Sequence, residues 1–539
     1  MDFVSKEGLF LLLFLFIAIV AGAAQRLKVP YPILLTIIGG VLGILPIFPN
    51  IALEPDLVFF VFLPPLLFAA GWQLSWREFR GNLGRILMLA LGLVVFTIVV
   101  LIFGRTSLLP GFDWQSALLL GAIVGATDAI AATAIAKQLG LPRKVVDILE
   151  AESLVNDGSG LLAFQFGLVI LVTGHSPSVV EGAGKLVYLA GGGILVGLCM
   201  GFIASRLEKW IDDGPIEIVV SLVLCYSVYI VAERMHTSGV LAVIACSMLM
   251  SHDSHRFMSP QVRLQFAAVW DVLTFVLNGM VFILIGLQLP FVLSQLQGMG
   301  RGRLLWAGAS FSLAIVLLRV LWIFCETYSV TLFRKLRKLP GTQTQSWQEL
   351  TVLSWGGMRG VLSLAAAFSL PYTRANGVAF EQRSMIIYLT FCLIVTTLLL
   401  QGLSMPGLIR MLGIQGSDEE EREERHARRT LVEQALRHLN RRRVQDRFDP
   451  KIIHELTTIY ERRLRALPDR HEFQSEGFSR IQRDQLLIEI LAVEREALLK
   501  LRDEDDISDD VARIIQRDLD LLESHVHTGS ASSVLTDLV

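Results

Sequence analysis

Long apolar runs dominate the first three quarters of this chain and restrict the folds open to it. A helix that crosses the hydrocarbon core of a bilayer needs about 20 apolar residues. Runs of roughly this length lie between polar or Gly/Pro breaks at 8–25, 31–48, 56–72, 85–104, 115–137, 147–173, 185–205, 215–233, 237–251, 267–289, 304–333, 351–370 and 384–412. The sequence therefore predicts an all-α integral membrane protein with about 13 transmembrane helices.

Charge divides the chain into two parts. Residues 1–414 contain 27 Lys+Arg and 22 Asp+Glu, whereas the much shorter 415–539 contains 21 and 28. We expect a transmembrane domain at 1–414 and a charged, helical cytoplasmic domain at 415–539. The tail lacks any phosphate-binding glycine loop, and we expect neither a cofactor nor a nucleic-acid partner. A regulatory or dimer-supporting role is our interpretation, and a solvated tail without a specific role is the alternative.

The distribution of basic residues predicts the orientation in the membrane. With the N-terminus outside, the loops on the inner side carry 16 Lys and Arg, and the outer segments carry 8. Basic residues accumulate on the cytoplasmic side of membrane proteins. We therefore expect a multi-pass protein of the cell membrane, with a bacterial inner membrane as the default, the N-terminus outside and the tail in the cytoplasm.

The number of apolar segments suggests an internal repeat. If segments 1–6 and 8–13 form two six-helix units joined by the seventh, the units begin on opposite sides of the membrane. Secondary transporters use such inverted repeats and place their sites at broken helices in corresponding positions. The fifth segment contains Gly121–Ala129 and the twelfth contains Ser354–Gly360, both rich in glycine and interrupted by polar residues. Broken, crossing helices are predicted there, although glycine also serves close helix packing.

Two aspartates lie deep in neighbouring apolar segments. Asp128 is in the fifth, and Asp157 lies ten residues past Asp147 in the sixth, roughly 15 Å along a helix. Ser153, Asn156 and Asp157 are three and four residues apart and share one helix face. Carboxylates inside a membrane are costly and usually functional. We predict a site for a monovalent cation, Na⁺ or K⁺, with Asp157 and Asp128 as its acidic ligands.

Burial suggests how this site works. Removal from water disfavours the ionised form of a carboxylate, and a bound cation favours it. A proton and a cation would then compete for Asp157. If each crosses only while bound, exchange follows.

Further charged residues lie within apolar segments. We predict that Glu152 and Arg359 form a buried ion pair, because either alone would be costly there. Arg319 and Glu326, seven residues apart, are expected to face the bundle as structural anchors. Asp271 and Asn278 are polar residues of the tenth segment; Asn278 could line the path, but a packing amide is favoured.

The motifs together resemble sodium/proton antiporters of the NhaP/NHE type. They are Gly125-Ala-Thr-Asp128, Glu152-Ser-Leu-Val-Asn-Asp157-Gly, Trp355-Gly-Gly-Met-Arg359-Gly, Leu63-Pro-Pro65 and Leu277-Asn-Gly279, in order within 1–414. The resemblance implies thirteen helices in dimerisation and core subdomains, a homodimer, and crossed broken helices.

The resemblance also implies roles for single residues. Asp157 would bind the cation and the proton, and Asn156, Asp128, Thr127 and Ser153 would arrange the site. Glu152 and Arg359 would be the stabilising pair. An Asn-Asp pair, where electrogenic relatives have Asp-Asp, goes with electroneutral exchange of one cation for one proton.

One departure affects the expected cation. Many family members carry an acidic residue shortly after the Pro pair, but Leu66–Gly71, with Ala69 and Ala70, contains none. We expect an electroneutral Na⁺/H⁺ antiporter, with K⁺/H⁺ or mixed Na⁺/K⁺ exchange as the alternative. An intramembrane aspartyl hydrolase using Asp128 and Asp157 as a dyad and an ion channel are remote alternatives, so we expect no enzymatic activity.

Overall fold

The fold is described here from a computed structural model of the chain. It describes residues 6–27, 29–44, 58–74, 76–139, 141–174, 178–211, 213–294, 296, 300–336, 346–375, 377–414, 418–443, 450–465, 498 and 521. Nearly all of these residues are helical, and the described part contains an isolated β-bridge between Thr373 and Ala379 but no strand. The chain divides into two compact units, Met1–Gly416 and Ser417–Val539.

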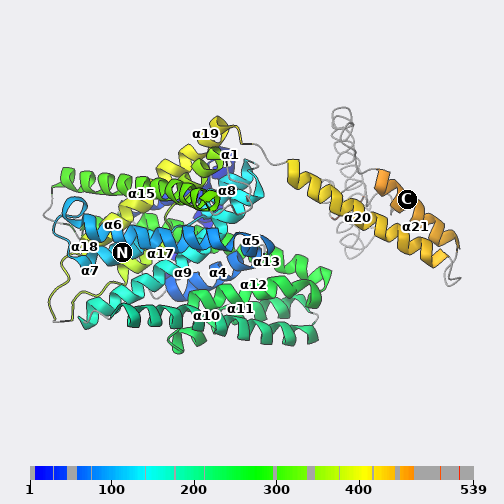
Figure 1. Cartoon of the computed structure of the whole chain (residues 1–539), viewed down its shortest axis with the longest axis horizontal. Helices are drawn as coiled ribbons and strands as arrows, with labels where there is room; N and C mark the ends of the chain where they lie inside the picture. The colour runs from blue at the N-terminus through cyan, green and yellow to red at the C-terminus, as the bar shows by residue number, and fades with distance from the viewer. Residues whose placement is uncertain are drawn as a thin grey trace. The chain divides into compact units, whose positions relative to one another are not determined.

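The first unit holds the apolar helices (Figure 1). In its first half these are α1 (Lys6–Leu27), α2 (Tyr31–Ile44), the π-helical turn η1 (Val58–Phe62), α4 (Leu63–Gln73), α5 (Trp76–Leu87), the π-helical turn η2 (Met88–Gly92), α6 (Leu93–Leu108), α7 (Trp114–Gly125), α8 (Ile130–Gln138) and α9 (Arg143–Thr173). Then come α10 (Val179–Leu207), the 3₁₀ turn η3 (Glu208–Trp210), α11 (Gly214–Arg234), α12 (Gly239–Phe257), α13 (Pro260–Leu287), α14 (Leu289–Ser294), α15 (Arg301–Leu336), α16 (Trp347–Trp355), α17 (Val361–Phe368), α18 (Arg383–Thr396), the π-helical turn η4 (Thr397–Gln401) and α19 (Gly402–Leu412).

The all-helical membrane fold is confirmed. Among the described residues, eight helices are long and apolar enough to cross a membrane, from Phe79–Leu108 to Arg383–Leu412, and four apolar helices are shorter. Each predicted apolar segment contains helix. The number of thirteen crossings and the inverted repeat stay predictions.

Polar side chains start several of these helices. Ser178 and Ser346 form capping boxes at the starts of α10 and α16 with the glutamate three residues on. Asp113 and Asp213 accept a backbone N–H at the starts of α7 and α11. The first N–H groups of a helix have no partner within the helix, so a capping oxygen stabilises the end by about 1 kcal/mol.

Two apolar segments are interrupted at the positions predicted from glycine and polar residues. α7 ends at Gly125 and α8 begins at Ile130, and α16 ends at Trp355 and α17 begins at Val361. The two breaks touch, because the backbone N–H of Asp128 donates to the carbonyl of Met358 at 2.8 Å. A side chain at Gly360 would overlap Asp128, so glycine is required for this approach.

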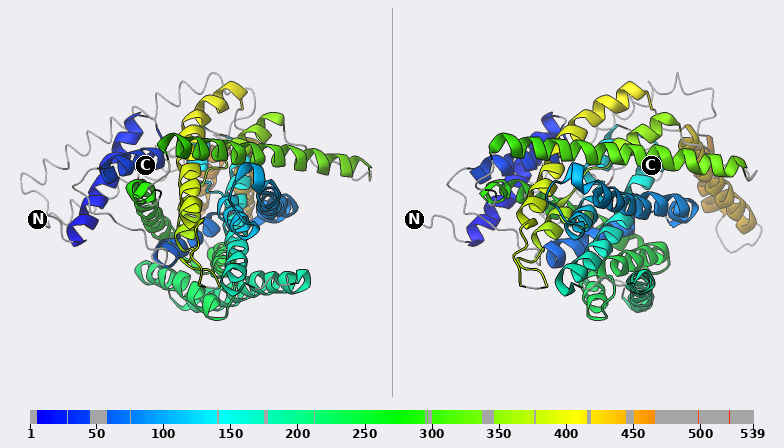
Figure 2. Two further views of the ribbon diagram at one scale, coloured as in Figure 1. Left: turned by 90° about the vertical axis from the view of Figure 1, so that its left-hand side faces the viewer. Right: turned by 60° about the vertical axis from the view of Figure 1, so that its left-hand side comes forward.

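The helices of the first unit pack as two groups. The core group comprises α5–α9 and α15–α19, and the flanking group comprises α1, α2, α4 and α10–α13. α10, α11 and α12 run along one edge of the unit, and the long α15 lies on the opposite side (Figures 1 and 2). α4, α12 and α13 contact α9 or α17, which brings the flanking group against the broken helices.

The second unit contains two described helices, α20 (Asp418–Arg443) and α21 (Pro450–Arg465), which pack against each other. Ile453 is buried in this contact region, whereas Leu431 and Ile452 are exposed. The helical character predicted for this part of the tail is confirmed for these residues.

Candidate functional site

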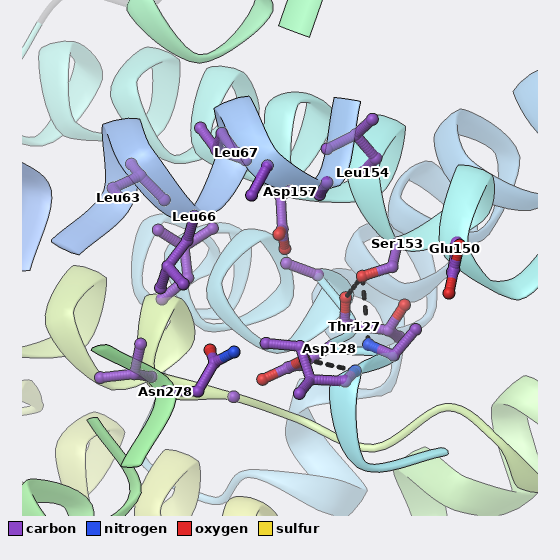
Figure 3. A pocket seen from close by; sticks show the side chains of 18 of the residues that line it. Leu63, Leu66, Leu67, Thr127, Asp128, Glu150, Ser153, Leu154, Asp157 and Asn278 are labelled. Carbon is purple, nitrogen blue, oxygen red and sulfur yellow. Dashed lines mark hydrogen bonds between the residues drawn. The ribbon is translucent and has the colours of Figure 1, made fainter. Parts of the chain in front are cut away.

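A cavity of about 260 Å³ lies where the flanking group meets the broken helices. Its walls come from α4 and α13 on one side and from the α7–α8 break, α9 and α17 on the other. Asp157 points into it from α9, and Thr127, Asp128 and Ser153 lie around it (Figure 3). Four of the five residues predicted for the ion site are thus brought together.

The fifth predicted residue, Asn156, is not among the residues that line the cavity. It is fully buried behind the break, and its side-chain amide donates to the Thr127 hydroxyl at 3.2 Å. Asn156 therefore positions the break rather than facing the cavity. Ser159, one turn further on α9, donates to the carbonyls of Asn156 and of Ala90 in η2.

Ser153 fixes the extended segment between α7 and α8. Its hydroxyl donates to the Thr127 carbonyl at 2.8 Å and accepts from the backbone N–H of Ala129 at 3.1 Å. These bonds satisfy backbone groups that the break removes from the helical ladder. Two of the three polar residues predicted on one face of α9, Ser153 and Asn156, thus hold the broken helix in place.

The two aspartates have different surroundings. The Asp128 carboxylate accepts the backbone N–H of Ile130 at 2.9 Å, at the start of α8, and lies against Gly360, the residue that precedes α17. Helix N-termini stabilise negative charge. No described residue donates a hydrogen bond to the Asp157 carboxylate, which lies in the middle of α9 and keeps part of its surface accessible through the cavity. Asp157 is thus the carboxylate left free to take a proton or a cation.

Two buried arginines donate hydrogen bonds to the carbonyls at the ends of α7 and α16. Arg359 donates through Nε to the carbonyl of Val124, in the last turn of α7, at 2.8 Å. Arg319 on α15 donates to the carbonyls of Ser354 and Leu353, in the last turn of α16, at 3.3 and 3.1 Å. Helix C-termini carry unpaired carbonyls and partial negative charge, so each guanidinium stabilises one half-helix.

The predicted ion pair of Glu152 with Arg359 is wrong. Glu152 pairs with Arg319 instead, through Nη1 to Oε1 at 2.6 Å and Nη2 to Oε2 at 3.0 Å, and both side chains are almost fully buried. Arg359 is occupied by carbonyls at the end of α7 and at Gly357. Both arginines lie in apolar segments, and their spacing along the chain does not reveal which one faces α9.

The other intramembrane polar residues have distinct places. Glu326 is buried on α15 and accepts from Thr327, and Arg319 faces the bundle as an anchor, as predicted for both. Asp271 is exposed on α13. Asn278, for which a packing role was favoured, lines the cavity (Figure 3). Ala69 and Ala70, which lie in the segment where many family members carry an acidic residue, line it as well.

Comparisons with known proteins give the family. The family described as sodium/hydrogen exchanger, transmembrane, matches residues 12–410. The Na⁺/H⁺ antiporter ApNhaP of Aphanothece halophytica is 34% identical over 417 residues, covering 77% of this chain and 76% of that protein. A sodium, potassium, lithium and rubidium/H⁺ antiporter of Bacillus pumilus is 30% identical over 424 residues, covering 76% of this chain and 62% of the relative.

A solved structure has a similar fold. The sodium proton antiporter MjNhaP1 of Methanocaldococcus jannaschii aligns with a TM-score of 0.60 at 21% identity, over 75% of this chain and 98% of that one. Three observations indicate the same family: the broken helices, the buried carboxylates between them and the family match over residues 12–410. The chain belongs to the family of transmembrane sodium/hydrogen exchangers, which are cation/proton antiporters.

Proposed function

We propose that this protein exchanges one monovalent cation for one proton, without net charge movement, by competition at Asp157. The observation that carries the proposal is the position of this carboxylate. It lines a cavity beside the contact between two broken helices, and no described residue donates a hydrogen bond to it. A carboxylate removed from bulk water favours a bound proton or a bound cation over free charge.

The surrounding oxygens suit an alkali cation. Asp128, Thr127 and Ser153 line the same cavity as Asp157, and hard cations prefer such oxygen ligands. Asp128 would remain charged beside the start of α8 and attract the cation. Asp157 would alternate between binding a proton and binding the cation. One titrating carboxylate gives one proton per cation, hence electroneutral exchange.

We propose Na⁺ as the transported cation, with K⁺ or mixed exchange as the alternative. The Aphanothece relative is named for Na⁺, and the Bacillus relative for sodium, potassium, lithium and rubidium. The apolar wall at Ala69 and Ala70 contributes no charge to the site. A site with fewer charges discriminates less among cations by field strength.

Transport requires that the cavity open to each side in turn. The cavity lies between the core and flanking groups, so movement of one group against the other would expose Asp157 alternately. We propose that the apolar segments 1–6 and 8–13 form two inverted six-helix repeats, each of which contributes helices to both groups. We also propose that the protein is a homodimer in the cell membrane with its N-terminus outside, and that 415–539 is a cytoplasmic regulatory or dimer-supporting domain.

The hydrolase alternative lacks support from the site. A catalytic dyad needs two carboxylates that share a proton. Asp128 is bonded to the start of α8, whereas no such bond holds Asp157. The two carboxylates therefore differ in their hydrogen bonding, which suits different roles in a cation site.

The test is transport by the purified protein in sealed vesicles. With an imposed pH gradient, addition of Na⁺, K⁺ or Li⁺ should move protons in the opposite direction to the cation. Clamping the membrane potential at zero should not change the rate, because no net charge moves. Asp157→Asn should abolish exchange while the protein still folds. Cation flux that depends on voltage and not on the pH gradient would refute the proposal.

A further inference from the structure

The cavity has two walls of opposite character. The wall formed by the α7–α8 break and α9 presents Thr127, Asp128, Ser153 and Asp157. On the facing wall, α4 contributes the apolar side chains of Leu63, Leu66, Leu67, Ala69 and Ala70. A cation bound to the first wall therefore finds no oxygen from these α4 side chains opposite it.

Polar atoms on the facing wall come from three residues. Gln73 is exposed at the end of α4, and Thr274 and Asn278 lie one turn apart on α13. The hydroxyl of Thr274 donates to the carbonyl of Trp270 at 2.8 Å, within its own helix. Asn278 is the most buried of the three side chains.

The amide oxygen of Asn278 is buried and accepts no hydrogen bond from the part of the chain that the structure describes. The residue is 8% exposed, and its Oδ1 is fully enclosed. Buried polar groups in proteins nearly always have a hydrogen-bond partner, and an unsatisfied oxygen is unfavourable. The Oδ1 of Asn156 also accepts no hydrogen bond from a described residue, but Asn156 does not line the cavity, and its Nδ2 donates to Thr127. Asn278 instead reaches into the cavity that Asp128 and Asp157 share (Figure 3).

We propose that Asn278 Oδ1 is a ligand of the transported cation, supplied from the flanking group. This inference rests on the proposed cation/proton exchange at Asp157. An amide oxygen is a suitable neutral ligand for a hard cation. Because it carries no charge and does not titrate, it strengthens cation binding without altering the number of protons exchanged.

The position of Asn278 has a consequence for transport. The carboxylates belong to the core group and Asn278 to α13 of the flanking group. The complete set of ligands therefore exists only while the two groups face each other as they do here. When the groups move, the cation loses one neutral oxygen, which lowers its affinity in the other state and favours release.

The test separates cation affinity from the maximal rate. In vesicles containing the full chain, Asn278→Leu removes the oxygen at nearly constant volume. It should raise the apparent KM for Na⁺ and for K⁺ about tenfold, with a smaller change in the maximal rate. Thr274→Val is the matched control, because it removes a polar atom from the same wall, one turn away and less buried than Asn278; its KM should stay within about twofold of the wild type.

A second variant keeps the test decisive if Asn278→Leu fails to fold. Asn278→Asp preserves an oxygen at this position and should leave the KM for Na⁺ at or below the wild-type value, whereas Asn278→Ala should raise it. A purely structural role predicts lower expression or thermal stability in the Leu and Ala variants with an unchanged KM, and that result would overturn the inference.

The two proposals fail in different ways. Wild-type protein that exchanges no cation for protons refutes both. Wild-type exchange that disappears in Asp157→Asn, together with an unchanged KM in Asn278→Leu or Asn278→Ala, refutes the role of Asn278 alone.

Discussion

At the scale of single residues, the site depends on which buried arginine binds the carbonyls at the end of each broken helix. Arg319 binds Glu152 and the last carbonyls of α16, and Arg359 binds those of α7. α7 and α16 thus each end on a guanidinium, and among the described residues Glu152 supplies the carboxylate paired with one of them. The two arginines therefore have similar structural tasks but different partners.

This difference predicts different rescue. Arg319→Ala leaves the buried Glu152 carboxylate without its ion partner and should lower stability by about 3–5 kcal/mol. Glu152→Gln should restore part of that loss, because it removes the stranded charge. Arg359→Ala should also destabilise, but Glu152→Gln should not rescue it. Thermal unfolding of the four purified variants checks this; rescue of the Arg359 variant instead would favour the pair that the sequence suggested.

A second residue-scale prediction concerns Asp113, in the connection before α7. It caps that helix and pairs with Arg374. Although burial raises the pKa of Asp113, the bonds from Ser116 and Arg374 outweigh it and hold the pKa below its usual value. The stabilisation is therefore complete above the unfolded pKa of about 3.9 and is lost as the pH falls through the lower folded value.

Asp113→Asn keeps a good capping side chain but removes the charge. Because the pair is partly exposed, the loss at pH 7 should be at most about 1 kcal/mol. Asp113→Ala should cost about 1 kcal/mol more through the lost cap. Melting temperatures measured between pH 3 and 7 should show the wild-type advantage over Asn shrinking below about pH 4. An advantage that grows on acidification would show that the carboxylate does not act as described.

Single residues were also the hardest feature to predict from the sequence. Asp128 and Asp157 could be found because charge is rare in apolar segments, Ser153 because it shares a helix face with Asp157, and Thr127 through the family resemblance; all four line the cavity. The partner of Glu152 could not be predicted, because Arg319 and Arg359 are similarly buried and both could pair with it. Only the packing of α15 against α16 determines which arginine does so. Asn278 gave a signal, an amide in an apolar helix, but no periodicity separates a ligand from a packing amide.

At the scale of helices, the two breaks are the features that place the site. They were predictable from sequence, since glycines and polar residues cluster at Gly121–Ala129 and Ser354–Gly360. Their contact was not, because the bond from Asp128 to Met358 joins segments far apart in the chain. The lengths of the half-helices depend on this contact as well.

Gly360 should be intolerant of any side chain. A Cβ there would overlap both the carboxylate and the Cβ of Asp128, so Gly360→Ala must push the two breaks apart. Exchange activity should fall by at least about tenfold, while helical content by circular dichroism stays unchanged. Gly184→Ala on α10 is the control, because a Cβ there meets no atom within 4 Å. Equal activity of the two variants would mean that the contact of the breaks does not matter for transport.

At the scale of the whole molecule, the cavity lies between two groups of helices, and the proposed mechanism has these groups move against each other. The first unit contains the complete cavity, since every residue that lines it lies between Leu63 and Ser363. The second unit begins at Ser417. Transport is therefore expected to need only the first unit.

Deletion of residues 415–539 tests this division of tasks. The truncated protein should still exchange cations for protons in vesicles, because the site is intact. We expect a shifted pH dependence of the rate or a weaker dimer, measured by light scattering of the purified protein. A truncated protein that folds but no longer transports would show that the tail belongs to the transport machinery.

The central claim is that a proton and a cation exclude each other at Asp157. The most direct measurement is the apparent KM of the wild-type protein for Na⁺, determined in vesicles over a series of pH values. Competition predicts that the KM rises steadily as the pH is lowered, while the rate at saturating Na⁺ stays nearly constant over that range. A KM that is independent of pH, with a maximal rate that falls instead, would contradict the account.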